Sequence, residues 1–210
     1  MLSPIDKNNT LLDDVLFLVL EVTDSVEGLI QKYENIDMVF DEFNKFSTDK
    51  RKKEFLSIRL AFKKLLGKDV IIRYDEQGKP YLEDRSYNIS ISHSGNWIAI
   101  IAHPTRFVGI DIECPSPKIK KLYTRFLSEA EQEDFSYGKD LRHLQLTWSA
   151  KEALYKIIGI QAVDFAKQLR IFPFEVKGEG EFKALHLPTN TDYNLSYLLT
   201  DNYALVYCIH

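Results

Sequence analysis

Two acidic residues lie one position apart in the segment GIDIE, residues 109–113. The alternation of apolar and acidic residues predicts a β-strand with its isoleucines on one face and Asp111 and Glu113 on the other. Acidic residues are poor strand formers, and like charges on one face of a strand repel each other. The pattern therefore favours a carboxylate pair that binds a cation, with a solvated strand face as the plainer alternative.

A third carboxylate lies in WSAKEALYK, residues 148–156, which has the pattern of a helix. Glu152 and Lys156 are four positions apart and share one face of this helix. The plainer interpretation is a surface ion pair that contributes about 0.3–0.5 kcal/mol. Together with Asp111 and Glu113, however, Glu152 forms a set of hard oxygen ligands that suits Mg²⁺, an ion that usually completes its shell with water and substrate phosphates. The sequence thus predicts a magnesium site and a phosphate or pyrophosphate ester as substrate.

Lys151 falls inside the apolar stripe of the same predicted helix. Two interpretations of this position stay open. The side chain either extends along apolar surface to bring its ammonium to water, or it reaches an anion at an interface between two lobes.

Possible anion contacts lie in the first half of the chain. Ser92 and His93 stand near the end of a predicted strand, beside a glycine, where hydroxyl and backbone N–H groups are available to a phosphate. Lys79 lies at a predicted turn. A basic helix adds Arg51 and also Arg59, which borders the apolar stripe of that helix. Taken singly, each of these residues has an ordinary surface or packed position as its plainer interpretation.

Hydrophobic periodicity predicts an α+β protein that positions these residues. Ser128 and Glu131 have the spacing of a capping box at a helix start. In this motif the serine side chain accepts the backbone N–H of the glutamate, and the glutamate side chain accepts the backbone N–H of the serine. Predicted helices cover 52–67, 125–135 and 143–159. Predicted strands cover 14–22, 70–74, 88–94, 97–103, 107–113, 171–178, 181–187, 193–200 and 203–210.

Each half of the chain therefore reads as a strand, a helix and then antiparallel strands. This order predicts two similar lobes, residues 1–104 and 105–210, each an antiparallel sheet packed with helices. No sequence repeat accompanies the predicted repeat of structure.

The composition excludes several classes of protein. With 45% hydrophobic and 28% charged residues, the 210-residue chain is an ordinary globular protein. A net charge of -4 argues against a general nucleic-acid binder. The apolar run 15–20 is too short to span a membrane. Two cysteines provide no disulfide framework and fit a reducing compartment, so we expect a cytoplasmic protein.

Five motifs together resemble the 4'-phosphopantetheinyl transferases, and the Sfp-like two-lobe branch fits best. The motifs occur in the order and approximate spacing of that family over about residues 50–159, while the last fifty residues match only as a set of strands. They are GKPYL, NISISHSGNW, FVGIDIE, RFLSEAE and WSAKEALYK.

The resemblance implies a pseudo-dimer of two lobes that binds coenzyme A and Mg²⁺ in the cleft between them. In such enzymes a serine hydroxyl of an acyl or peptidyl carrier protein attacks the β-phosphate of coenzyme A. The products are the holo carrier and adenosine 3',5'-bisphosphate. The resemblance names neither the carrier nor its pathway. We expect a monomer, because the two lobes already supply both sides of the cleft.

The resemblance also assigns roles in the predicted catalytic centre. Asp111, Glu113 and Glu152 resemble the metal ligands of the family. Glu152 is the preferred base for the serine proton, with Glu113 or a metal-held water as rivals. Lys156 is expected to contact the pyrophosphate and stabilise the leaving group.

A second set of residues resembles the family's contacts with the nucleotide of coenzyme A. Ser92 and His93 correspond to the pair that contacts the 3'-phosphate, and Lys79 and Arg59 to further basic contacts. Arg51 is one of several candidates for an N-terminal basic contact, because that segment has no fixed spacing.

Two alternatives remain. A metal-dependent nuclease is disfavoured by the acidic net charge and by Pro115, which stands where a common nuclease pattern has lysine. A non-catalytic module that binds coenzyme A or a carrier protein would have no reason to keep all three carboxylates and Lys156. One departure from the family concerns the loop after Gly159, which lacks the second glycine found in many relatives.

Overall fold

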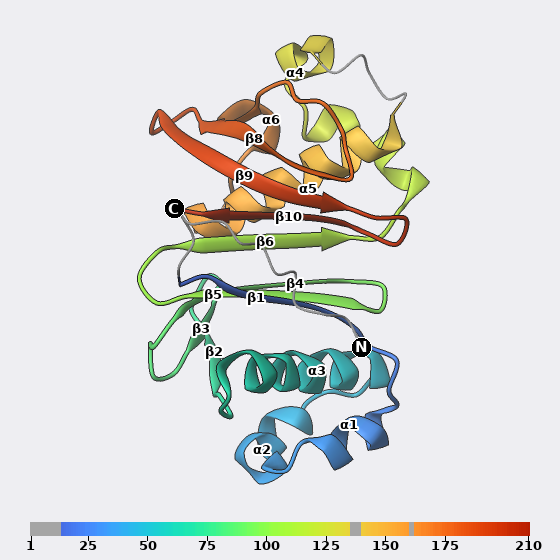
Figure 1. The fold of residues 1–210 in the computed structure, drawn as a ribbon, viewed down its shortest axis with the longest axis vertical. Coiled ribbons are helices and arrows are strands. Elements are labelled where there is room, and N and C mark those ends of the chain that lie inside the picture. The colour runs from blue at the N-terminus through green and yellow to red at the C-terminus, as the bar shows by residue number, and fades with distance from the viewer. Residues whose placement is uncertain (1–13, 135–139, 160–161) are drawn as a thin grey trace. The chain divides into compact units, whose positions relative to one another are not determined.

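A computed structural model of the protein describes residues 14–134, 140–159 and 162–210. The chain divides into two compact units, the first ending at Thr105 and the second beginning at Arg106. Each unit contains an antiparallel sheet and a long helix packed on it (Figure 1). The α+β fold class predicted from periodicity is therefore confirmed. The cleft between the lobes stays a prediction.

The first unit combines a small sheet, a hairpin and a group of helices. Its elements are β1 (Leu16–Glu21), α1 (Val26–Lys32), η1 (Ile36–Val39), α2 (Phe40–Phe43), α3 (Asp49–Leu66), β2 (Ile72–Tyr74), β3 (Pro80–Leu82), β4 (Asn88–Ser94) and β5 (Trp97–His103).

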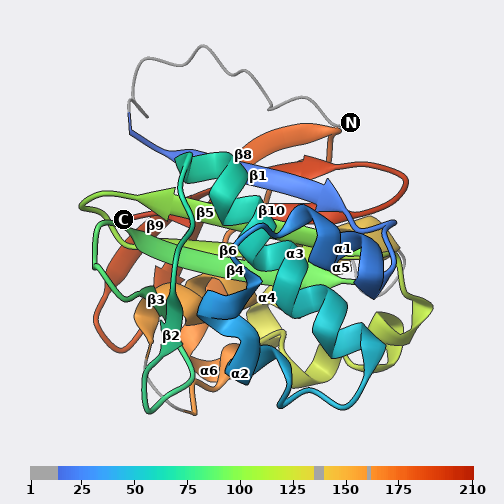
Figure 2. The same ribbon diagram turned by 90° about the horizontal axis from the view of Figure 1, so that it is seen from below.

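Strand β5 is the centre of the sheet in the first unit, since the strand order is β1-β5-β4 and both pairings are antiparallel. The turn between β4 and β5 contains Gly95 at φ 58°, in the left-handed region that glycine adopts without strain. Helix α3 packs its apolar side, including Ile58 and Phe62, against Ile98 and Ile100 of β5. Figure 2 shows α1 and α2 lying beside α3.

Several basic side chains of α3 are held by acidic partners within the same unit. Arg51 contacts Glu54 at 2.9 Å, and Lys63 contacts Glu34 at 3.0 Å. Arg59 lies inside the unit instead of at the border of the helix. The excess of basic residues in this part of the sequence therefore does not translate into an equally basic surface.

The second unit contains the larger sheet. Its elements are β6 (Val108–Glu113), η2 (Pro117–Lys121), η3 (Tyr123–Arg125), α4 (Glu129–Asp134), α5 (Leu141–Ile158), α6 (Phe165–Gln168), β7 (Leu169–Ile171), β8 (Glu179–His186), β9 (Thr191–Leu199) and β10 (Ala204–Ile209).

The sheet of the second unit has the order β6-β10-β9-β8-β7, and all of its pairings are antiparallel. Helix α5 begins after Asp140, whose carboxylate accepts the N–H of Arg142, and ends at Gly159 with φ 65°. Leu146, Ala150 and Leu154 of this helix belong to the hydrophobic core that it forms with the sheet. The helix runs along one face of the sheet (Figure 1).

One detail of the sequence prediction is wrong. Residues 171–178 do not form a strand: β7 ends at Ile171, and the following segment contains Pro173, which has no N–H to donate to a ladder. The plainer alternative for the GIDIE segment, a solvated strand face, is also wrong, because residues 108–112 are all buried. The predicted change of shape after Gly159 falls partly on residues 160–161, which lie outside the described residues.

The predicted capping box is confirmed. The Oγ of Ser128 accepts the N–H of Glu131 at 3.2 Å, and the Glu131 carboxylate accepts the N–H of Ser128 at 2.8 Å.

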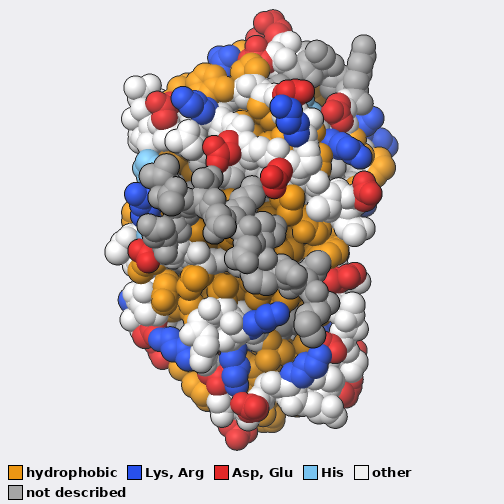
Figure 3. Space-filling view, viewed as in Figure 1, with side chains coloured by type: hydrophobic (Ala, Val, Ile, Leu, Met, Phe, Trp, Pro, Cys, Tyr) orange, Lys and Arg blue, Asp and Glu red, His pale blue; other side chains and the backbone are white. Residues whose placement is uncertain are grey.

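On the face drawn in Figure 3, Lys and Arg side chains are interspersed with Asp and Glu side chains. None of the helices that the structure describes is long and apolar enough to cross a lipid bilayer.

Candidate active site

Strand β6 and helix α5 approach each other unusually closely at Gly109. A Cβ atom built on this glycine would lie 2.1 Å from the carbonyl oxygen of Ala153 and 2.9 Å from the side chain of Ile157. Any larger residue would push the helix away from the strand. The glycine of the GIDIE segment therefore sets the short distance across which the polar residues of the two elements interact.

Asp111 and Lys156 are brought together by this contact. The Nζ of Lys156 donates to Oδ1 of Asp111 at 3.0 Å and to the carbonyl oxygen of Ile110 at 2.7 Å. The Asp111 side chain is 6% exposed and that of Lys156 is 25% exposed. The pair is thus nearly buried on the carboxylate side, while the ammonium keeps access to solvent.

Glu113, at the end of β6, is oriented by the same helix. The indole Nε1 of Trp148 donates to Oε1 of Glu113 at 3.2 Å. One helical turn earlier, the side-chain amide of Gln145 donates to the carbonyl oxygen of Cys114 at 3.1 Å. Both hydrogen bonds fix the C-terminal end of β6 against the first half of α5.

Glu152 lies near both carboxylates of β6. Burial and the charges of Asp111 and Glu113 raise the pKa of Glu152 to about 7, while the nearby ammonium of Lys156 opposes this rise. A carboxyl group with a pKa near neutrality is suited to accept and release a proton at physiological pH. The structure therefore brings together the three predicted acids and the predicted lysine, Asp111, Glu113, Glu152 and Lys156.

The three carboxylates are ligands of the type that Mg²⁺ prefers, but their oxygen atoms are not arranged around one common point. Within the described part of the chain, no group of three or more His, Cys, Asp or Glu side chains is gathered as a metal site. Oδ1 of Asp111 contacts an ammonium and Oε1 of Glu113 contacts an indole N–H. Burial first, and then the charges of Asp111 and Glu113, disfavour the ionised form of Glu152, and a divalent cation would favour that form.

Two of the predicted nucleotide contacts in the first unit share one carboxylate. Glu54 contacts Arg51 at 2.9 Å and Nδ1 of His93 at 3.6 Å. Arg51 and His93 are exposed, whereas Ser92 on β4 is buried. The sequence indicated Arg51 and His93 as candidate contacts, but it did not indicate Glu54, the residue near the start of α3 that contacts both.

The two remaining basic residues differ in their surroundings. Lys79 lies on the β2–β3 hairpin and is half-buried, and burial lowers its pKa. Arg59 is 2% exposed, donates to Glu42 at 3.0 Å and lies 3.4 Å from the ring centre of Phe55. Because its guanidinium is enclosed by these partners, we interpret Arg59 as a structural cation and omit it from the proposed ligand contacts.

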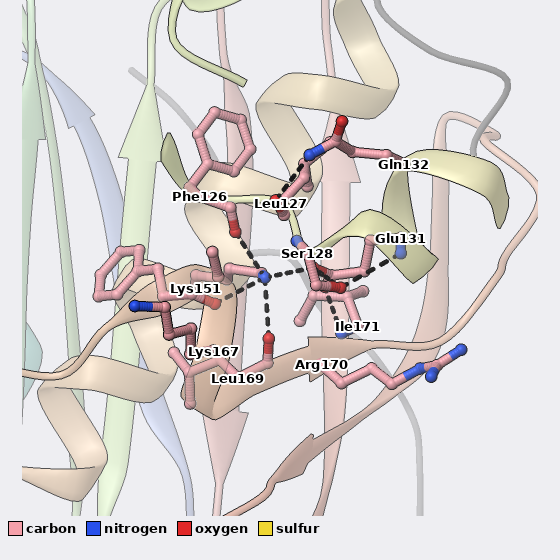
Figure 4. A network of polar contacts seen from close by, with 12 residues as sticks. Phe126, Leu127, Ser128, Glu131, Gln132, Lys151, Lys167, Leu169, Arg170 and Ile171 are labelled. Atoms are coloured by element: carbon pink, nitrogen blue, oxygen red, sulfur yellow. Dashed lines mark hydrogen bonds and ion pairs between the residues drawn. The ribbon is translucent and has the colours of Figure 1, made fainter. Parts of the chain in front are cut away.

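The first interpretation left open for Lys151 is wrong, and the second is right in that the lysine reaches an anion, which is Glu131 of the same unit. The lysine side chain is completely buried, and its Nζ donates to the Glu131 carboxylate at 2.7 Å and to three backbone carbonyl groups (Figure 4). Burial lowers the pKa of Lys151, and Glu131 opposes this effect. The carbonyl oxygens belong to Phe126, Phe165 and Leu169, at 2.7, 2.9 and 2.8 Å.

Glu131 and Trp148 are site neighbours that the sequence did not indicate. Glu131 was assigned only to a capping box, and nothing in its local spacing predicts a second contact with a lysine 20 positions away. Trp148 had the pattern of an ordinary apolar helix residue. A signal was available for Lys151 alone, because a charged residue within an apolar stripe requires a buried partner.

Comparisons with known proteins agree on one family. Residues 107–208 match the model of a family described as the 4'-phosphopantetheinyl transferase superfamily. A Thraustochytrium protein named phosphopantetheinyl transferase is 25% identical over 51% of this chain. A Haemophilus influenzae protein provisionally named 4'-phosphopantetheinyl transferase is 32% identical over 50% of it. The chain spans less than half the length of these relatives, 43% and 47% respectively.

Proposed function

We propose that the chain, whose residues 107–208 match the model of the 4'-phosphopantetheinyl transferase superfamily, transfers 4'-phosphopantetheine from coenzyme A to a serine of an apo acyl or peptidyl carrier protein. The observation that carries the proposal is the position of Glu152. Its carboxyl group, with a pKa of about 7, lies beside two acids and a lysine within the matched region.

In the proposed reaction the serine oxygen bonds to the β-phosphorus of coenzyme A. The bond from that phosphorus to the oxygen bridging the two phosphates breaks, and adenosine 3',5'-bisphosphate leaves. Glu152 accepts the serine proton, because a base with a pKa near the working pH combines availability with proton affinity. Glu113, which accepts the indole N–H of Trp148, and a metal-held water are the rival bases.

Lys156 has the position required to stabilise charge on the pyrophosphate. Its side chain is 25% exposed, and its ammonium is held by Asp111 and by the carbonyl oxygen of Ile110. A partly exposed ammonium fixed in this way presents positive charge to an anionic ligand without a large loss of side-chain entropy. We therefore assign it to the leaving phosphate.

Mg²⁺ is the cation that this donor set would hold, through Asp111, Glu113 and Glu152. When bound, it supplies positive charge that neutralises the pyrophosphate. The support in the structure is the raised pKa of Glu152, which has burial as its largest cause and the charges of Asp111 and Glu113 as further causes, beside the single ammonium of Lys156.

We propose that four residues contact the nucleotide part of coenzyme A: Ser92, His93, Lys79 and Arg51. Arg51 and His93 are exposed and both contact Glu54. An anionic ligand would compete with the Glu54 carboxylate for these two side chains. We further propose a monomer in a reducing, cytoplasmic compartment. One chain already contains two units of similar construction, and Cys114 and Cys208 form no disulfide.

The test is intact-mass spectrometry of apo carrier proteins incubated with this protein, coenzyme A and Mg²⁺. We expect a carrier serine to gain one phosphopantetheine, and we expect EDTA to abolish the gain. Glu152→Gln should abolish transfer while leaving the fold intact, whereas the matched change Glu133→Gln on α4 should have no effect. Glu133 is exposed and lies outside the group of residues around Glu152.

Fatty-acid, polyketide and peptide carriers should be tested in parallel. Binding of coenzyme A without modification of any carrier would contradict the proposal and identify a binding module. Transfer that continues at the full rate in EDTA would contradict the role of the metal.

A further inference from the structure

Lys151 is adjacent in sequence to Glu152, yet it belongs to a different network. Its ammonium is enclosed by four oxygen atoms at 2.7–2.9 Å, one from Glu131 and three from backbone carbonyl groups. An ammonium has three N–H groups, so every one of its donors is engaged. Figure 4 shows these contacts converging on the lysine from separate segments of the chain.

The Glu131 carboxylate is equally engaged. Oε2 accepts from Lys151 at 2.7 Å and from the N–H and Oγ of Ser128, while Oε1 accepts the backbone N–H of Ile171 at 2.8 Å. One buried ion pair therefore ties the start of α4 and the end of β7 to a single turn of α5. Both side chains are 0% exposed.

The opposite side of the same helical turn is held by β6. The backbone of Ala153 contacts Gly109, and Lys156 bonds to Ile110 and Asp111. Successive residues of an α-helix differ by about 100° in direction. With one side of the turn fixed by the ion pair and another fixed by β6, the direction of the intervening residue, Glu152, is determined.

Stability alone does not explain such a pair. Removing two charges from water is unfavourable, and a buried ion pair is often replaced by apolar residues of similar size without loss of stability. A fully satisfied buried network does fix one arrangement of the elements that it joins. The exact direction of α5 matters in this protein because the acids on α5 and β6 must converge.

We propose that Lys151 and Glu131 are a positioning pair, which holds α5 in the register against β6 that aims Glu152 at Asp111 and Glu113. The pair itself contacts no substrate. Its kinetic consequence rests on the proposed transfer reaction, whereas its structural consequence does not.

The structural test uses the indole N–H of Trp148, which reports the register of α5 against β6 through its hydrogen bond to Glu113. The chain has two tryptophans, so a ¹H–¹⁵N spectrum contains two indole signals, and Trp97 in the first unit is the internal reference. In Lys151→Met/Glu131→Gln we expect the Trp148 signal to shift and its exchange with water to become at least about tenfold faster.

The kinetic test uses the same double variant. We expect kcat for transfer to fall at least about tenfold while KM for coenzyme A changes less than about twofold, because the binding groups remain. The matched control is Arg170→Met/Asp134→Asn. That ion pair, at 3.0 Å, also joins β7 to α4 but is partly exposed and involves no residue of α5. We expect the control to leave both readouts unchanged.

An unchanged indole signal in the folded double variant overturns the proposal, and so does a shifted signal with unchanged kcat. If the double variant does not fold, Glu131→Asp decides, because it keeps the charge and shortens the side chain by one methylene. An unchanged indole signal and kcat in Glu131→Asp overturns the proposal. If the wild type transfers nothing to any carrier, the proposed function fails, and the indole signal alone decides whether the pair positions α5.

Discussion

The first unit and the second unit share two corresponding elements. Each begins with a strand and contains an 18-residue helix capped by a glycine with φ of 70° or 65°, and the first strand pairs with the last strand of the unit. The same interval along the chain separates Leu16 from Val108, where the strands begin, and Asp49 from Leu141, where the helices begin. Residues of the first strand and of the long helix can therefore be matched by position between the two units.

The matched positions show where the units differ. Val19 and Leu60 of the first unit correspond to Asp111 and Glu152 of the second. Apolar residues at these positions suit a strand and a helix that pack on each other, whereas carboxylates there are costly unless they interact with other groups. The comparison indicates that the acids of the second unit serve chemistry and not the fold.

A buried cation occupies the same matched position in both helices, Arg59 in α3 and Lys151 in α5. Arg59 pairs with Glu42, whose side chain is 31% exposed, whereas Lys151 pairs with a carboxylate that is 0% exposed. The scaffold thus accommodates a cation at this point of either helix, and the second unit encloses it more completely.

The largest expected effect comes from making the second unit resemble the first. Glu152→Leu places the counterpart residue of α3 in α5, and we expect transfer to fall by at least about 10²–10³-fold, since general-base catalysis contributes about this much. The protein should fold, because leucine is tolerated at the matched position. Steady-state kinetics and thermal unfolding measure the two effects. More than a tenth of the wild-type rate would remove Glu152 from the mechanism.

The close approach of α5 to β6 is also specific to the second unit, because the counterpart of Gly109 is Phe17. Gly109→Ala places a Cβ 2.1 Å from the carbonyl oxygen of Ala153, so we expect a loss of about 1–3 kcal/mol of stability and a lower transfer rate. Urea unfolding measures the loss. Gly178→Ala is the control, since a Cβ there meets nothing within 4 Å, and equal stability of the two variants would contradict the contact.

The acids of the second unit should make its stability depend on pH. The pKa of Glu152 is raised to about 7 in the folded protein, from 4.5 when unperturbed, so its contribution to stability is complete below pH 4.5 and is lost as pH rises through 7. In EDTA, Glu152→Gln should therefore be more stable than the wild type at pH 8, by about 1–3 kcal/mol.

Urea unfolding at pH 5 and pH 8 tests this difference. Added Mg²⁺ should stabilise the wild type at pH 8 and should stabilise Glu152→Gln less, since a ligand that binds the folded state shifts the equilibrium by mass action. The same difference in stability between the wild type and Glu152→Gln at both pH values would show that folding does not raise the pKa of Glu152.

The smallest effect is expected in the first unit. Arg51→Ala should raise KM for coenzyme A by about two- to fivefold with little change in kcat, because an exposed ionic contact contributes about 0.2–1 kcal/mol. Lys32→Ala is the matched control, since Lys32 is an exposed cation of the same unit paired with Asp24 at 2.7 Å. An unchanged KM in Arg51→Ala would remove that residue from the proposed contacts.

Much of the fold followed from local patterns. The helix ends at Gly67 and Gly159 and the hairpin at Gly95 were predicted from residue types that specify those conformations. The segment 171–178 misled the prediction because its apolar residues imitate a strand, whereas in the structure Phe172 and Phe174 flank a proline within an irregular segment. Periodicity reports which residues seek burial, but not whether they are buried in a strand or beside one.

The candidate site was predictable to the level of residue types. Two acids on a strand, an acid and a lysine one turn apart on a helix and a glycine in the strand are all legible in the sequence, because spacing within an element fixes which residues share a face. The surroundings of each side chain were not legible. The pattern placed Arg59 at the border of an apolar stripe and Lys151 inside one, and it named the buried partner of neither.

The sequence by itself thus determined the two long helices, most of the longer strands and the residue types that could do chemistry, since these depend on backbone preferences and on the period of apolar residues. Only the tertiary structure decided that Lys151 pairs with Glu131, that Gly109 admits the backbone of α5, and that burial raises the pKa of Glu152 to about 7. Partners distant in sequence and the loss of water around a charge arise only when separate elements pack together.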